Sequence, residues 1–364
     1  MNKGKRRIDR MNSFVVGIDL GEKESNACYM SPDGEIKEGF KFLMNKEGYT
    51  EFRKKIPVET RIAFEASGSA YAVSKALKDL GYNDITVAHP KELSWITKSK
   101  KKNDRVDSVK LAKLHLVGMI PESHLLDENE RIFRDLLIQR VKLGKSISSI
   151  KNMIIGYLKR EGVFDSLPES TDNFSLKRRK AMREIRFGNP KDLVLRTMID
   201  RLEFLEKQIT PIDAEIKKSA KESEDVKLLM SIPGIDYYLA SLLSSYIGDI
   251  KRFESSDKLA SFFGIITSTR DSSSIKRRGH MSKEGSQTAR WALSIAVDTV
   301  MLFNKPIREY YDSVKNRKGS GKFAHVSTMR KLIRMIFTML TERKTWKYEN
   351  TRLTEKKVSG LEEE

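Results

Sequence analysis

The sequence has very little cysteine and no long apolar run. The single cysteine among 364 residues, Cys28, excludes an internal disulfide and a cysteine-rich zinc site. The five histidines show no spacing typical of metal ligands. No apolar stretch approaches the roughly 20 residues that a membrane-spanning helix needs, so no membrane partner is expected. A reducing, cytoplasmic location is consistent with these absences.

Acidic residues are fewer than basic ones, 50 against 69, which leaves a formal net charge of +19. A basic excess of this size favours a polyanionic partner, most simply nucleic acid. Charge alone also allows a protein that is merely basic. The length of 364 residues predicts two or three domains with an ample core.

Four of the acidic residues stand at conspicuous places. Asp19 and Glu65 each end a short apolar run, and Asp104 and Asp107 stand three apart at the start of a helical pattern. An acid at the end of a buried strand must be solvated or ligated, because a bare buried charge is very costly. Residues at i and i+3 share one face of a helix.

These four carboxylates together predict a site for Mg²⁺ or Mn²⁺, which prefer oxygen ligands. Such ions stabilise the oxygens of a phosphoryl transfer. Each acid alone also has a structural interpretation, with Asp104 as a helix N-cap and Asp107 as a first-turn acid favoured by the helix dipole. Their joint placement favours the metal site.

Residues 13–122 are predicted to form an α/β domain that follows a basic tail, residues 1–12. Its order is three strands, helix, strand, helix, strand, helix, which is the order of a ribonuclease H-like fold. The expected strands are Phe14–Leu20, Asn26–Met30, Ile36–Leu43, Ile62–Ala66 and Ile85–Ala88.

Residues 123–222 contain two long apolar repeats in steps of three and four. They predict two long helices, paired either as a hairpin within one chain or as a coiled coil between protomers. A plain helical bundle within one chain fits equally well.

Residues 223–345 are predicted to form a mainly helical domain, and residues 346–364 a charged, frayed tail. The fold class is therefore multidomain, α/β plus α. The third domain contains the serine cluster Ser272–Ser274. A serine hydroxyl is a poor nucleophile unless a base, a metal or nearby positive charge activates it.

Basic residues flank both the acids and the serines. They are expected to bind nucleic-acid phosphates, either at the scissile bond or along the backbone. Beside the acids these residues are Lys101, Lys102 and Arg105. Beside the serines they are Lys276, Arg277, Arg278 and Lys283.

An ordered set of short motifs resembles the DEDD transposases of the insertion-sequence-110 family, which includes Piv-like DNA invertases. In the N-terminal part these motifs are Gly17-Ile18-Asp19, Glu65-Ala66-Ser67-Gly68 and Lys102-Asn103-Asp104-Arg105-Val106-Asp107-Ser108. Downstream they are Ile232-Pro233-Gly234-Ile235, Phe263-Gly264, Ser272 and Gly279-His280-Met281-Ser282-Lys283-Glu284-Gly285.

The resemblance implies a RuvC-like N-terminal domain, a coiled-coil insertion and a C-terminal transposase domain with a catalytic serine. It implies that the four acids hold metal and that Ser272 is the nucleophile, with Ser273 and Ser274 as alternatives. The implied activity is excision and insertion of a mobile DNA element by serine–phosphate exchange. It further implies guidance by a structured (bridge) RNA and work as homodimers that pair into tetramers on DNA.

Two other functions fit parts of the sequence. Residues 17–21, Gly-Ile-Asp-Leu-Gly, also resemble the first phosphate motif of sugar kinases and actin-like ATPases. That class needs a second Asp-x-Gly motif at a strand end, and none follows. The other alternative is a non-catalytic nucleic-acid-binding protein, against which the four intact carboxylates argue.

Overall fold

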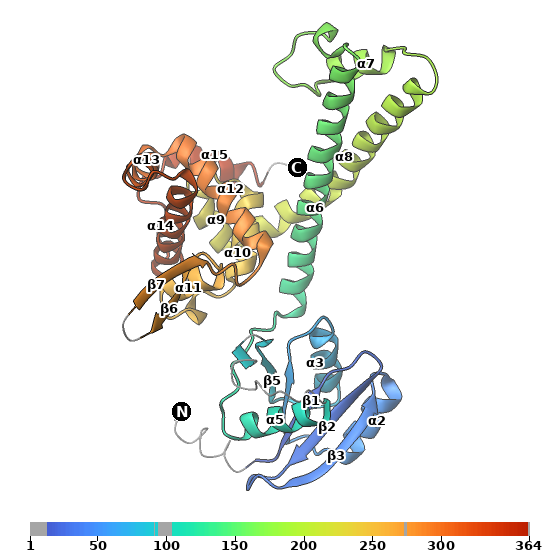
Figure 1. The fold of residues 1–364 in the computed structure, drawn as a ribbon, viewed down its shortest axis with the longest axis vertical. Coiled ribbons are helices and arrows are strands. Elements are labelled where there is room, and N and C mark those ends of the chain that lie inside the picture. The colour runs from blue at the N-terminus through green and yellow to red at the C-terminus, as the bar shows by residue number, and fades with distance from the viewer. Residues whose placement is uncertain (1–12, 91, 94–103, 273–274, 363–364) are drawn as a thin grey trace. The chain divides into compact units, whose positions relative to one another are not determined.

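The computed structural model describes residues 13–90, 92–93, 104–272 and 275–362, with the backbone alone for residues 104–105 and 267–280. Lys101, Lys102, Ser273 and Ser274 therefore lie outside the described residues. The chain divides into two compact units, Met1–Asp127 and Glu128–Glu364. The first unit is α/β and the second is mainly helical (Figure 1), as the composition of the predicted elements indicated.

A five-stranded sheet forms the centre of the first unit, in the order β3-β2-β1-β4-β5. Strand β2 is antiparallel to β1 and β3, whereas β4 is parallel to both β1 and β5. The strands are β1 (Val15–Asp19), β2 (Glu24–Met30), β3 (Ile36–Leu43), β4 (Arg61–Glu65) and β5 (Ile85–Ala88). All five lie within two residues of the predicted strands.

Helices cover both faces of this sheet (Figure 1). One face packs its apolar side chains, among them Ile18 and Phe64, against α2 (Lys46–Lys55) and α3 (Ala70–Asp79). The other face lies against α5 (Asp104–Leu116), where Val15 and Met30 contact Ala112. The predicted order of three strands, helix, strand, helix, strand, helix is confirmed.

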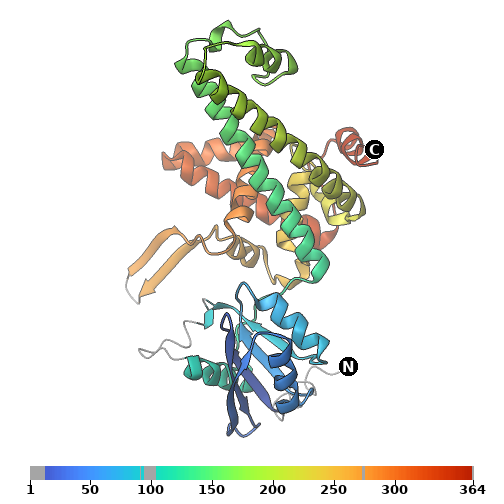
Figure 2. The same ribbon diagram turned by 90° about the vertical axis from the view of Figure 1, so that its right-hand side faces the viewer.

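Two long helices, α6 (Glu128–Arg160) and α8 (Lys191–Glu222), run side by side in the second unit (Figure 2). Ile154, Ile199 and Leu202 are at most 1% exposed in the core between them. Of the arrangements that the sequence left open, the structure contains the pairing within one chain.

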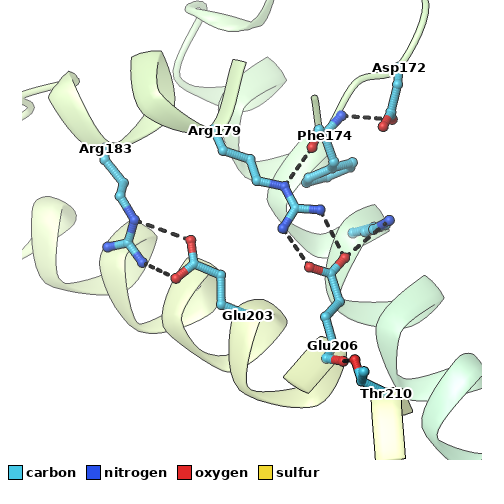
Figure 3. A network of polar contacts seen from close by, with 8 residues as sticks. Asp172, Phe174, Arg179, Arg183, Glu203, Glu206 and Thr210 are labelled. Carbon is cyan, nitrogen blue, oxygen red and sulfur yellow. Dashed lines mark hydrogen bonds and ion pairs between the residues drawn. The ribbon is translucent and has the colours of Figure 1, made fainter. Parts of the chain in front are cut away.

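The connection between these helices contains a short 3₁₀ turn (Phe164–Ser166) and α7 (Leu176–Glu184). Two ion pairs join α7 to α8 (Figure 3). Arg179 Nη2 donates to Glu206 Oε1 at 2.9 Å, and Arg183 Nη2 donates to Glu203 Oε2 at 2.9 Å. Burial opposes ionisation of the Glu206 carboxyl, but the hydrogen bonds and positive charges of Arg179 and Lys151 together outweigh it and lower its pKa. These charge-assisted bonds hold α7 on the hairpin.

The rest of the second unit packs helices around one apolar core. The helices are α9 (Glu224–Met230), α10 (Tyr237–Ile247), a 3₁₀ turn (Ile250–Arg252), α11 (Ser256–Phe262), α12 (Gln287–Phe303), α13 (Lys305–Lys318), α14 (Gly321–Glu342) and α15 (Thr351–Ser359). A two-stranded hairpin, β6 (Thr267–Ser272) and β7 (Ile275–Met281), joins α11 to α12. Across the described ranges, no helix combines the length and the apolarity that crossing a bilayer requires.

The expectation of a frayed C-terminal tail was wrong. Trp346 is 2% exposed and Leu361 is 6% exposed, and both belong to the core of the second unit. Lys357 of α15 donates hydrogen bonds to the carbonyl oxygens of Ile232 (3.2 Å) and Ile235 (3.0 Å). The charged composition concealed two buried apolar side chains and one half-buried ammonium, which together fix the segment.

Leu202 tests the hairpin within one chain. Leu202→Ala should destabilise the α6–α8 pair by about 2–5 kcal/mol, because it leaves a cavity in a closed core. Phe204→Ala is the matched control, since that neighbouring side chain is 59% exposed, and it should change stability by no more than about 0.5 kcal/mol. Hydrogen exchange of the α6 and α8 amides measures both. Equal protection in the two variants would contradict the arrangement.

Candidate functional site

Two of the predicted carboxylates lie on neighbouring strands at one edge of the sheet. β1 and β4 are parallel, and their last paired residues are Ile18 and Phe64. Asp19 and Glu65 follow directly and end the two strands. Adjacent strands are about 4.8 Å apart, so these residues are close neighbours at the carboxyl edge. Asp19 is half-buried and Glu65 is exposed.

Both acids are on the sheet face that α5 covers. Ile18 and Phe64 point into the core beneath α2 and α3. Successive side chains of a strand point to opposite faces, so Asp19 and Glu65 belong to the other face.

Helix α5 crosses β1 in close contact. A Cβ atom at Gly17 would lie 2.2 Å from the Ser108 carbonyl oxygen and 2.4 Å from the Ala112 nitrogen. At the other end of the strands, Arg61 Nη2 donates to the His115 carbonyl oxygen at 3.1 Å. The helix therefore runs opposite to β1, and its first turn lies toward the carboxyl edge of the sheet.

The first turn of α5 contains Asp104 and Asp107, so all four predicted acids belong to the same edge and the same face. The Asp107 carboxylate accepts a hydrogen bond from Lys110 Nζ at 2.8 Å. The side chain of Asp104 lies outside the described residues, as does that of Arg105. In the described part of the chain, no three carboxylate, histidine or cysteine side chains are gathered closely enough to hold a metal ion.

The donor chemistry of this edge nevertheless fits a hard divalent cation. Asp19, Glu65 and Asp107 offer carboxylate oxygens, the ligands that Mg²⁺ prefers. An exposed Glu65 leaves room for a substrate oxygen or water beside such an ion. What the described residues lack is convergence of the side chains, not suitable donors.

Of the serine cluster, the described residue is Ser272, which ends strand β6 of the β6–β7 hairpin in the second unit (Figure 1). Ser272 is the last residue of β6 and is paired with Ile275, with two residues between them. Arg270 is paired with Arg277, and Asp271 with Lys276. Successive residues of a strand belong to opposite faces of a sheet. Arg277 is therefore on the same face of the hairpin as Ser272, whereas Lys276 and Arg278 are on the opposite face.

Two glycines hold the base of this hairpin. A Cβ atom at Gly264 would lie 1.8 Å from the Glu284 carbonyl oxygen, and one at Gly285 would lie 2.2 Å from that of Phe262. Both glycines have positive φ, +67° and +91°. Between them, Lys283 is exposed and has a φ of 52°, which is uncommon for a residue with a side chain. Glycine is needed here because two backbone segments approach each other too closely for any side chain.

The Pro-Gly turn at residues 232–235 has a structural role in this unit. Ile232 and Ile235 are fully buried, and a Cβ atom at Gly234 would lie 2.9 Å from the Thr299 carbonyl oxygen on α12. The turn is therefore packed inside the helical core.

Sequence reasoning missed one basic group. Arg330, Lys331 and Arg334 of α14 line a pocket of about 410 Å³ together with Tyr310 of α13. The three basic residues lie within about one helical turn of the sequence, a spacing that places them on one face of a helix. The apolar residues between them made the segment look like an ordinary amphipathic helix.

Comparisons with known proteins agree in both halves of the chain. A transposase model for DEDD proteins of the IS110 group matches residues 16–162. A model described as the transposase IS116/IS110/IS902 family matches residues 226–312. The first range contains the four acids, and the second contains Ser272 and the basic residues that follow it.

Individual relatives are similar over most of their lengths. The transposase for insertion sequence element IS1111A of Coxiella burnetii is 22% identical over 347 residues, which cover 94% of each chain. The transposase for insertion sequence element IS1328 of Yersinia enterocolitica is 25% identical over 70% of this chain and 74% of its own. A Sinorhizobium fredii protein, named as the putative transposase y4qE, is 21% identical over 84% of this chain and 75% of its own.

Gly17→Ala tests the contact that places α5. The added methyl group would overlap the α5 backbone, so the helix must move away from β1, at a cost of about 1–3 kcal/mol or more. Gly68→Ala is the control in the same unit, because its Cβ would meet nothing within 4 Å. Thermal unfolding and hydrogen exchange of α5 should show a loss for Gly17→Ala alone. Unchanged protection of α5 in that variant would contradict the close contact.

Proposed function

Since this chain belongs to the IS110 family of insertion-sequence transposases and is thus a DNA transposase, we propose that it excises and inserts a mobile element by metal-assisted phosphoryl transfer. The observation that carries the proposal is the placement of Asp19, Glu65, Asp104 and Asp107 at one edge of one sheet face.

We propose that these four carboxylates hold Mg²⁺ or Mn²⁺. A bound ion would stabilise charge on the phosphate oxygens in the transition state. The chain's own contribution is to order the ligands: β1 and β4 set Asp19 and Glu65 side by side, and the α5 contact with Gly17 sets the height of Asp107 above them. Lys110, which pairs with Asp107, would have to yield that carboxylate when an ion binds.

The proposed nucleophile is Ser272. Its Oγ atom attacks the scissile phosphorus and loses its proton to a base or water. The bond from phosphorus to the leaving oxygen of the strand then breaks, and that oxygen takes up a proton. The hydroxyl of a second strand next displaces Oγ, which restores the serine and forms a new phosphodiester without ATP. Positive charge near the phosphate lowers the barrier to both displacements, and Arg277 has the face register to supply it.

Other parts of the proposal depend more on the family than on this chain. The strand order β3-β2-β1-β4-β5 with an antiparallel β2 supports a RuvC-like, ribonuclease H-like first domain. A net charge of +19 supports binding of a structured guide (bridge) RNA in addition to DNA. Homodimers that pair into tetramers on DNA complete the proposed assembly.

Removal of one carboxylate at a time tests the metal site. Asp19→Asn, Glu65→Gln and Asp107→Asn should each abolish strand cleavage and exchange while DNA affinity changes little, because affinity comes mainly from Lys and Arg. Asp79→Asn, an exposed acid of the same unit, should remain active. Activity assays with Mg²⁺ and anisotropy measurements of DNA binding separate the two effects. Full activity in the three variants would contradict the metal site at these carboxylates.

A trapped covalent intermediate tests the serine. Under conditions that stall strand exchange, mass spectrometry should find the DNA phosphate on Ser272, and Ser272→Ala should lose activity by on the order of 10⁴-fold or more, as loss of a nucleophile does elsewhere. An adduct on Ser273 or Ser274 would move the assignment along the loop. Strand exchange without any adduct would reject the covalent mechanism.

A further inference from the structure

Helix α14 has an apolar face and a basic face. Ala324, Leu332, Ile333 and Ile336 are fully buried in the core of the second unit. No acidic residue occurs in this helix before Glu342, its last residue. The basic face, defined as Ser327, Arg330, Lys331 and Arg334, follows the steps of three and four that keep residues on one side of a helix.

The basic face lines a pocket of about 410 Å³ between α14 and α13. Tyr310 of α13 and Met335 complete the described lining, which contains no acidic side chain. The three cationic groups lie within one helical turn, a rise of about 6 Å. Over such a length one strand of DNA has about two phosphates along the helix axis.

The positive charge of this face is largely uncompensated. In the part of the chain that the structure describes, Arg330 and Lys331 have no carboxylate partner. The Lys331 ammonium lies 4.1 Å from the centre of the Tyr310 ring, which positions the group without neutralising it. Arg334 pairs with Asp257 at 3.1 Å, but both side chains are more than half exposed, so this pair is weak.

Such an arrangement has a cost in the free protein. Like charges at i and i+4, as at Arg330 and Arg334, destabilise a helix by a few tenths of a kcal/mol, about as much as an opposite pair stabilises it. An anion bound between the two arginines attracts both of them, so the net electrostatic contribution of the pair becomes stabilising. An arginine fork also suits phosphate oxygens geometrically, and the Ser327 hydroxyl adds a neutral donor.

We propose that the pocket between α13 and α14 binds the phosphodiester backbone of DNA. This inference rests on the proposed function for the presence of DNA, and it assigns a contact surface whose residues are distinct from the acids and from the serine hairpin. The lining has no asparagine or glutamine with which to read base edges. The contact is therefore expected to anchor DNA irrespective of its sequence.

A charge-matched pair of triple variants tests this surface in the full chain. Arg330→Gln/Lys331→Gln/Arg334→Gln removes three charges from the pocket. Arg196→Gln/Arg201→Gln/Lys221→Gln removes three from exposed positions of α8. Fluorescence anisotropy with a duplex oligonucleotide, repeated over a range of salt concentrations, measures affinity. Circular dichroism melting confirms that both variants are folded.

The pocket variant should bind duplex DNA on the order of tenfold more weakly or worse. Its slope of log K against log salt should fall by about 1 for each lost phosphate contact, or about 2 in total for the two phosphates that the pocket spans. The α8 variant should resemble the wild type. Equal losses in both variants, or none in the pocket variant, would overturn the assignment. A loss confined to a structured RNA probe would overturn it in favour of RNA.

A second measurement does not depend on the variants folding. Acetylation of lysines in the wild-type protein, read by mass spectrometry, should be slowed at Lys331 by duplex DNA and unchanged at Lys221. Equal protection at both would reject the pocket. Failure of the proposed chemistry would be seen separately, as strand cleavage that survives Asp19→Asn, and would leave these binding results unaffected.

Discussion

The contact of α5 with β1 at Gly17 determines the candidate site in the first unit. The two backbones approach so closely that any side chain at this position would overlap Ser108 or Ala112. Glycine therefore sets both the height of the helix above the sheet and its position along the strand. Because α5 runs opposite to β1, this one contact brings its first-turn acids to the edge where β1 and β4 end in Asp19 and Glu65. Hydrogen bonding between β1 and β4 supplies the other half of the geometry.

A similar close approach organises the hairpin of the second unit. Gly264 and Gly285 let the segments around Phe262 and Glu284 meet backbone to backbone, and β6 and β7 begin and end beside this junction. The strand register pairs Arg270 with Arg277. On α14, the like charges of Arg330 and Arg334 have an electrostatic cost that bound phosphate would relieve.

Errors in the sequence predictions have identifiable causes. The segment after Trp346 looked frayed because its residues are mostly charged, yet a few side chains, Trp346 and Leu361 among them, dock it in the core. The long apolar repeats predicted two helices correctly, but a repeat does not say which chain supplies the partner. The basic residues of α14 were missed because their alternation with buried residues reads as an ordinary amphipathic helix until the pocket beside Tyr310 is seen.

Local chemistry in the sequence was enough to determine the strands, the helices, the acids at strand ends and the family motifs. Each of these depends on residues near one another in the chain, where apolar–polar alternation, apolar runs and helix-start residues can be recognised in the sequence. Only the tertiary structure decided that α6 and α8 pair within one chain, that α15 is docked, and that Asp19 and Asp107 share an edge. Those outcomes depend on contacts between segments far apart in sequence, and the periodicity of one segment does not specify which partner it will bury its apolar face against.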